Sequence, residues 1–140
     1  MTKHVLVDTN VLIDVLENDS SWVDWSIEQL RAQSKLRLLA INAIIYAELS
    51  LVFSRIEDLD DAVSQLGLTV LEIHRPALFV ASRAFMQYKR AGGTKSNMLP
   101  DFLIGAHAAT EQIPVLTRDV RRYKTYFPTV TLIAPSATSD

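Results

Sequence analysis

Four carboxylates stand at positions where the surrounding sequence predicts burial, and these are the residues best suited to do chemistry. Each one either ends, interrupts or opens an apolar stretch. The four are Asp8, Glu48, Asp101 and Asp119. Carboxylates are rarely buried unless they are paired with another group or bound to a cation. Their positions therefore raise the question of whether they share one site.

Each acid also has a simpler structural interpretation. Asp101 and Asp119 are acceptable at helix N-termini, where exposed backbone N–H groups favour negative charge. Asp8 is able to form a turn with its own backbone. Glu48 is harder to explain in this way, because it lies on an apolar helical stripe with Ile45 and no basic residue follows at helical spacing. These alternatives remain open from the residues alone.

If the four acids converge, their mutual repulsion is severe in a medium of low dielectric constant. Protonation or a bound divalent cation would relieve it. The chain has no cysteine, and its histidines lack the spacing of metal ligands. A site built from oxygen ligands favours Mg²⁺, with Mn²⁺ as an alternative. We expect structural or surface roles for the three histidines, which are His4, His74 and His107.

Short apolar runs alternate with helical patterns along the chain. We predict strands over 5–8, 36–41, 69–73, 114–117 and 130–133, with helices in the intervening segments. Asn10 and Asn42 are expected to cap the helices that follow them, the second of which reaches about Phe53. This alternation predicts an α/β fold, a three-layer α/β/α sandwich with a mostly parallel central sheet. Ligands bind at the carboxyl ends of parallel strands, which is where Asp8 and Asp119 fall.

The 140 residues are predicted to form a single domain over 1–134, with a frayed tail over 135–140. No apolar stretch is long enough to span a membrane, and no secretory signal is present. Together with the lack of cysteine, this predicts a soluble cytoplasmic protein. The net charge of −2 means that any nucleic-acid binding would depend on local basic patches.

Four segments resemble the acidic motifs of PIN-domain ribonucleases: "VLVDTNVLID", "AELS", "LPDFLIGAHA" and "LTRD". The chain length and the ending "YFPTVTLIAP" are similar to those of VapC toxins from bacterial toxin–antitoxin pairs. The resemblance covers nearly the whole chain, and the first and third segments are its most specific parts. Its acidic positions fall on the four carboxylates, with Asn10 and Thr117 as polar companions.

The resemblance implies a Mg²⁺-dependent endoribonuclease that leaves a 3′-hydroxyl and a 5′-phosphate. We expect Asp8 and Asp101 to be the closest metal ligands, with Glu48 and Asp119 acting through water or a second ion. Asn10 would then hydrogen-bond to the ligands. The resemblance also implies a VapB-type antitoxin as partner, and a homodimer.

Two sets of basic residues are candidates for binding RNA phosphates beside the acids. One flanks a glycine pair and the other surrounds Asp119. They comprise Lys89, Arg90 and Lys95, and Arg118, Arg121 and Arg122. The alternative for both groups is a solvated charged surface.

Two other functions fit parts of the same pattern. A haloacid-dehalogenase-like phosphatase also begins with an aspartate after a strand, but it commonly has a second aspartate where this chain has Asn10. A non-catalytic binding module on the same fold would use the acids structurally or to recruit a basic partner. Release of phosphate would indicate the former, and RNA cleavage that requires Mg²⁺ would exclude the latter.

Overall fold

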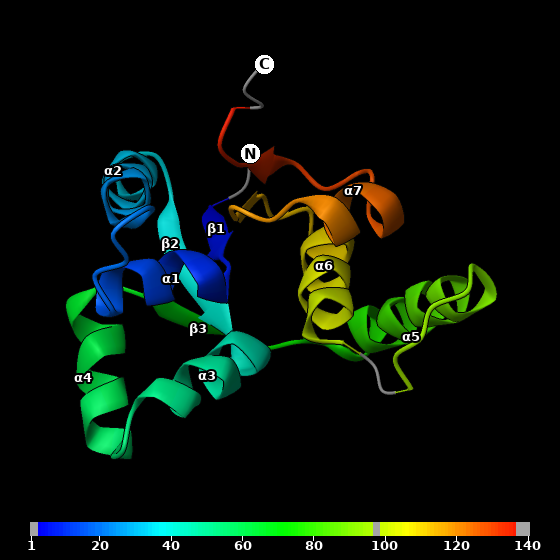
Figure 1. The fold of residues 1–140 in the computed structure, drawn as a ribbon, viewed down its shortest axis with the longest axis horizontal. Helices are drawn as coiled ribbons and strands as arrows, with labels where there is room; N and C mark the ends of the chain where they lie inside the picture. The colour runs from blue at the N-terminus through cyan, green and yellow to red at the C-terminus, as the bar shows by residue number, and fades with distance from the viewer. Residues whose placement is uncertain (1–2, 97–98, 137–140) are drawn as a thin grey trace.

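Five short parallel strands form the centre of the fold in the order β3-β2-β1-β4-β5 (Figure 1). The computed structural model describes residues 3–96 and 99–136. The strands are β1 His4–Val7, β2 Leu38–Asn42, β3 Thr69–Leu71, β4 Val115–Leu116 and β5 Leu132–Ile133. Every adjacent pair is parallel, which confirms the predicted fold class.

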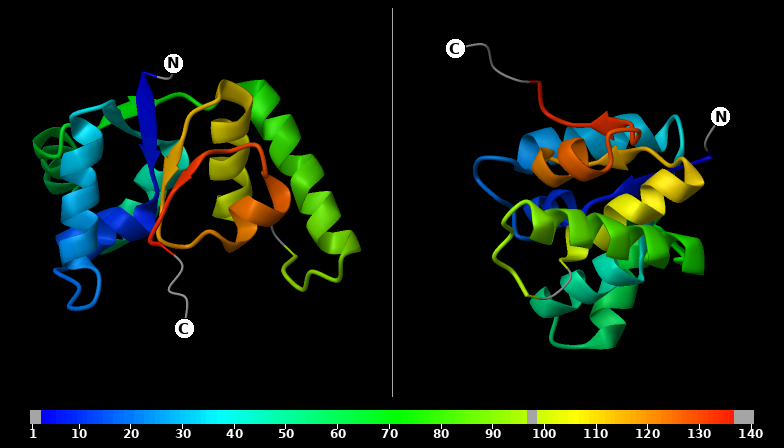
Figure 2. Two further views of the ribbon diagram at one scale, coloured as in Figure 1. Left: turned by 90° about the horizontal axis from the view of Figure 1, so that it is seen from above. Right: turned by 90° about the vertical axis from the view of Figure 1, so that its right-hand side faces the viewer.

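Helices cover both faces of this sheet. In Figure 2, β1 lies between α2 on one side and the adjacent helices α5 and α6 on the other. The helices are α1 Thr9–Leu16, α2 Val23–Ser34, α3 Ala43–Leu49, α4 Ile56–Gln65, α5 Arg75–Arg90, α6 Pro100–Glu111 and α7 Arg121–Tyr126. The helix predicted to reach about Phe53 ends earlier, and a 3₁₀ turn, η1 Ser50–Val52, replaces its last part.

The central strand explains why the sequence places an apolar run before Asp8. Val5, Leu6 and Val7 are completely buried, as expected for a parallel strand covered on both faces. Val7 of β1 is aligned with Leu116 of β4. The two strands therefore end together, and the residues that follow them, Asp8 and Thr117, become neighbours at the carboxyl edge of the sheet.

The first helix is capped differently from the prediction. The Asp8 side chain, not that of Asn10, caps α1 by accepting a hydrogen bond from the backbone N–H of Thr9 at 2.8 Å. Asp8 is the first residue after the strand, so it alone has the extended backbone that a cap requires. The predicted cap at Asn42 is confirmed, because its Oδ1 accepts from the backbone N–H groups of Ile44 and Ile45.

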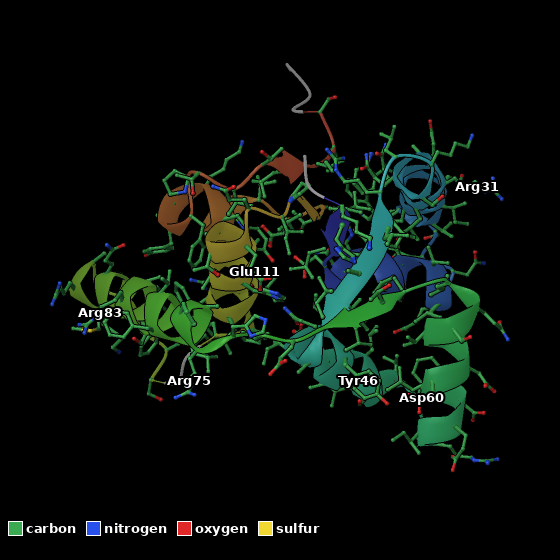
Figure 3. All side chains as sticks on the ribbon, turned by 180° about the vertical axis from the view of Figure 1, so that it is seen from behind. Arg31, Tyr46, Asp60, Arg75, Arg83 and Glu111 are labelled. Carbon is green, nitrogen blue, oxygen red and sulfur yellow. The ribbon has the colours of Figure 1, made fainter. Side chains whose placement is uncertain are left out.

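Two packing contacts outside the sheet help to place the site. Tyr46 reaches from α3 toward α4 and donates a hydrogen bond to Asp60 at 2.7 Å (Figure 3). A Cβ on Gly105 would lie 2.3 Å from the ring of Phe127, so only glycine lets the end of α7 pack this closely on α6.

Over the described ranges, none of the helices has the length and apolar character needed to cross a membrane. Most of the predicted frayed tail, 137–140, lies outside the described residues.

Candidate functional site

Asp8 is the most buried of the four carboxylates, with only 5% of its surface exposed. Its Oδ2 accepts hydrogen bonds from the hydroxyls of Thr117 at 2.9 Å and Tyr123 at 2.8 Å. Burial raises the pKa of Asp8 above its ordinary value, while these hydrogen bonds act in the opposite direction. The result is a desolvated carboxylate whose orientation is fixed by donors from three parts of the chain.

Glu48 on α3 is joined to Asp8 through Thr9. The Thr9 hydroxyl donates to Glu48 Oε1 at 2.6 Å, while the Thr9 backbone N–H donates to Asp8. Burial, followed by repulsion from Asp8, raises the pKa of Glu48. The sequence predicted that Glu48 has no basic partner on its own helix. In the structure its side-chain donor is a neutral hydroxyl, that of Thr9.

Asp101, in the first turn of α6, shares the electrostatic environment of the other acids. Burial and the charge of Asp8 raise its pKa to about 6, and Asp119 and Glu48 add to the rise while Arg122 opposes it. Asp101 therefore lies within electrostatic range of the other three acids. The alternation of strands and helices had predicted this edge of the sheet for Asp8 and Asp119.

Asp119 is the most exposed of the set and points toward a guanidinium. Its two oxygens accept from Arg121, at 3.1 Å from Nε and 3.0 Å from Nη2. This pairing lowers the pKa of Asp119. The predicted polar companions do lie beside Asp8: Asn10 donates to the Thr117 hydroxyl at 3.2 Å and accepts from the backbone N–H of Arg118 at 3.2 Å.

The acids have the right donor chemistry for Mg²⁺ or Mn²⁺, but their arrangement would have to change to hold one. Carboxylate oxygens are the ligands that such hard cations prefer. In the part of the chain that the structure describes, however, no three acids or histidines are close enough to share an ion. Asp119 is paired with Arg121, and Asp101 lies 3.5 Å from Nε of Arg122. Cation binding therefore requires at least one acid to separate from its arginine.

Tyr123 is a site residue that the sequence did not reveal. Its hydroxyl donates to Asp8 Oδ2 at 2.8 Å, and the residue is only 1% exposed. A buried tyrosine normally finds a hydrogen-bond partner, but nothing local in the sequence says that the partner is 115 residues away.

Arg118 has a different partner from the RNA phosphate that the sequence suggested. Its Nε and Nη2 donate to both oxygens of Asp14, at 2.8 and 2.9 Å, and its guanidinium lies over the ring of Trp22. Asp14 on α1 is 1% exposed and also accepts from Ser26. The Arg118 side chain thus ties α1 to the segment that carries Thr117.

The other basic residues lie at the periphery. Lys89 donates to the carbonyl of Lys95 at 3.1 Å, and both are exposed, as is Arg90. Arg121 and Arg122 instead face the acids. His107 is buried with Nδ1 3.0 Å from the amide of Asn42, so it belongs to the core between α3 and α6. This placement agrees with the structural role expected for it.

If the site cleaves RNA, as the sequence resemblance implies, the Tyr123→Phe variant should keep its fold but cleave RNA at least about tenfold more slowly, since a hydrogen bond to a charged group contributes about 1.5–3 kcal/mol. Without the hydroxyl, the ionised form of Asp8 is less stabilised, so the acid limb of the pH–rate profile should move to higher pH. The profile is measured alongside that of Tyr46→Phe, which removes a hydroxyl that contacts Asp60 and none of the four acids. Identical profiles for Tyr123→Phe and wild type would contradict this role.

In EDTA, the thermal stability of the protein should decrease as the pH rises from 3.8 to about 6, the interval between the ordinary and folded pKa values of Asp101. An acid with a raised folded pKa binds more protons when folded, so the added stability is present at low pH and is lost through this interval. Melting temperatures across the interval test this expectation. Asp101→Asn should flatten part of the slope, and the exposed control Asp24→Asn should not. Because the lowered pKa of Asp119 acts in the opposite direction, the difference between wild type and Asp101→Asn is the test, and equal slopes for the two proteins would contradict the expectation.

Comparisons with known proteins agree with the fold and the site. The sequence profile of the PIN domain matches residues 5–128. The structure is similar to VapBC2 from Rickettsia felis, with a TM-score of 0.72, 19% identity and coverage of 95% of this chain and 99% of that chain. It is also similar to VapBC from Salmonella typhimurium, with a TM-score of 0.69, 21% identity and coverage of 96% and 98%. No curated protein sequence matches.

This fold and site define a class of protein, a parallel α/β domain with a buried carboxylate, Asp8, at the end of its central strand. Within that class, the chain belongs to the PIN domain family, whose profile covers most of its length. PIN domains are generally nucleases that use divalent metal ions, so the chain falls in a class of hydrolases acting on nucleic acid.

Proposed function

We propose that this protein is a Mg²⁺-dependent endoribonuclease and the toxin of a toxin–antitoxin pair. The observation that carries the proposal is the buried carboxylate of Asp8, held by Thr117 and Tyr123, together with Asp101, whose pKa is raised to about 6 by burial and by the charges of Asp8, Asp119 and Glu48. A protein gains nothing in stability by collecting desolvated carboxylates, so their proximity indicates a cationic ligand. A further similar structure, with a TM-score of 0.67 and 20% identity, is named as a toxin–antitoxin complex from Klebsiella pneumoniae, which supports the toxin role.

Asp8 and Asp101 would hold the cation, with Glu48 and Asp119 completing the site through water or a second ion. When bound, the cation supplies positive charge that stabilises the phosphoryl oxygens and activates water for attack. The hydrogen bonds from Thr117 and Tyr123 favour the ionised form of Asp8 and fix its orientation, while Asn10 fixes Thr117.

The remaining residues act on the attacking water and the RNA strand. The Thr9 hydroxyl holds one oxygen of Glu48, which leaves the carboxylate oriented to position the water. Arg121 and Arg122, with Lys89, Arg90 and Lys95 farther out, supply positive charge for RNA phosphates. Arg118 contributes by positioning Thr117 rather than by contacting the substrate, because Asp14 already pairs with both ends of its guanidinium.

Incubation of purified protein with total RNA, followed by mapping of the new ends, tests the activity. We expect discrete breaks with 5′-phosphates in Mg²⁺ and none in EDTA or with the Asp101→Asn variant. Cleavage that persists in EDTA would reject the metal-dependent mechanism, and absence of cleavage with intact RNA binding would favour a non-catalytic module. Belonging to the PIN family already sets aside the phosphatase alternative.

We also propose a VapB-type antitoxin as partner. Leu51, Val52 and Ile56 are exposed beside a small cleft of about 150 Å³ between α3 and α4, close to the helix that carries Glu48. An apolar partner segment would bury this surface. We further propose that the protein forms a homodimer and that it is located in the cytoplasm, where it would encounter RNA. Light scattering of the isolated protein measures the oligomeric state.

A further inference from the structure

A pocket of about 480 Å³ opens beside the acids, and its lining differs from that of an ordinary metal site. Acids and bases face each other across it, with aromatic rings on one side. The residues that matter here are Asp101, Asp119, Arg121, Arg122, Tyr88 and Tyr126. Its volume lies within the range of about 300–1,000 Å³ found for ligand sites. A phosphate entering this pocket would meet two guanidinium groups and two carboxylates at once.

Each guanidinium in the pocket is paired with one of the proposed metal ligands, but the two pairs differ in quality. Arg121 makes two hydrogen bonds to Asp119. Arg122 Nε lies 3.5 Å from Asp101 Oδ2, which is long for a hydrogen bond. The Arg122 guanidinium is supported instead by aromatic rings, at 5.0 Å from the centroid of Tyr88 and 5.8 Å from that of Phe102.

This support means that Arg122 does not depend on Asp101 to stay in the pocket. Cation–π contact holds a guanidinium over a ring while leaving its N–H donors available. About a third of the Arg122 side chain is exposed, so these donors are within reach of a ligand. A cation that took Asp101 would remove the counter-charge of Arg122 and leave an unbalanced guanidinium beside the acids.

We propose that Arg122 exchanges partners: it neutralises Asp101 when no cation is bound, and it contacts a phosphate of the nucleic-acid strand, adjoining the scissile phosphate, when a divalent cation takes Asp101. This inference rests on the proposed function, and it adds the means by which metal and substrate promote each other's binding. A cation removes the negative charge that repels phosphate, and phosphate removes the guanidinium that competes with the cation. Such coupling is reciprocal by thermodynamic necessity.

The proposal predicts effects of opposite sign in one variant, which a purely structural role for Arg122 does not. Without RNA, Arg122→Gln should bind Mn²⁺ about two- to fivefold more tightly than wild type, the range expected for loss of a competing exposed ion pair. With Mn²⁺ present, the same variant should bind single-stranded RNA several-fold more weakly, and the slope of log affinity against log salt should fall by about 1.

Binding of Mn²⁺ is measured by electron paramagnetic resonance of the unbound ion, and RNA binding by anisotropy of a labelled strand of about 12 nucleotides. Gel analysis afterwards verifies that the strand is intact. Lys124→Gln is the matched control, because it removes the same charge from an exposed position on α7 that does not line the pocket. Its Mn²⁺ affinity should stay within about twofold of wild type. Melting temperatures show whether each variant folds.

Weaker or unchanged Mn²⁺ binding by Arg122→Gln, or unchanged RNA binding, would overturn the proposal. If Arg122→Gln fails to fold, Arg122→Lys provides the test, since lysine keeps the charge but loses the planar fork. It should show weaker coupling between Mn²⁺ and RNA than wild type, and unaltered coupling would overturn the exchange. Neither measurement requires cleavage, so absence of nuclease activity would reject the proposed function separately.

Discussion

In the Asp8→Asn variant, metal-dependent RNA cleavage should fall at least about a hundredfold, because a bound cation contributes several kcal/mol and each 1.36 kcal/mol is a factor of ten in rate. The substitution removes the charge at the centre of the site and keeps the number of non-hydrogen atoms. The fold should be as stable as wild type in EDTA, or more stable. Asp8 is a desolvated acid whose pKa is raised by burial, so its charge opposes folding.

The hydrogen bonds around position 8 show why the variant should fold. The asparagine carbonyl can accept from the Thr9 N–H, which places its amide where Oδ2 was. Tyr123 can then turn its hydroxyl to accept, and Thr117 can turn its own toward the carbonyl of Asp119, already 3.2 Å away. The Tyr123 O–H loses Asp8 Oδ2 as its acceptor in this arrangement, and the cost of this unpaired donor offsets part of the stability gained by removing the charge.

Cleavage rate and melting temperature are measured for Asp8→Asn beside Asp61→Asn, an exposed change of the same charge on α4. The control should leave both quantities unchanged. An Asp8→Asn variant that is folded and still cleaves at the wild-type rate in Mg²⁺ would place the cation elsewhere.

The elements of the fold were predictable because apolar runs report burial directly. The run before Asp8 marked β1, and Pro100 marked the start of α6. Where the strands end was less predictable. The last two were expected over four residues each, but only Val115–Leu116 and Leu132–Ile133 pair as strands. Apolar character continues past the point at which the ladder of hydrogen bonds stops.

The candidate site was predictable to the extent that burial of a charge is unusual. Glu48 stood out because it interrupts an apolar stripe. Asp14 is also buried, but the residues at helical spacing after it, Glu17 and Asn18, are polar, so no apolar stripe marks it. No such signal marks Tyr123, because a tyrosine near the end of a chain can equally well lie on the surface or pack in the core. Its contact with Asp8 depends on how α7 packs, which Gly105 and Phe127 determine.

The Arg118→Met variant should lose about 3–5 kcal/mol of stability, because it leaves the buried Asp14 carboxylate without its counter-charge. Asp14 is 1% exposed and would retain only the Ser26 hydroxyl as a side-chain donor. In a domain of this size, such a loss lowers the melting temperature by about 10 °C or more. Denaturant unfolding measures it, and Arg31→Met, a change at an exposed arginine on α2, serves as the control.

Removing the whole cluster distinguishes stability from positioning. The triple variant Asp14→Leu, Ser26→Ala, Arg118→Met leaves no unpaired polar group, and buried ion pairs replaced by apolar residues usually recover most of the lost stability. Its cleavage rate should nevertheless stay below that of wild type. Asn10 accepts from the Arg118 backbone N–H, so the segment that presents Thr117 to Asp8 is held from both sides. Recovery of stability together with the full rate would show that Arg118 serves the fold alone.

A single Arg118→Met variant that loses less than about 1 kcal/mol would show that water already screens the pair.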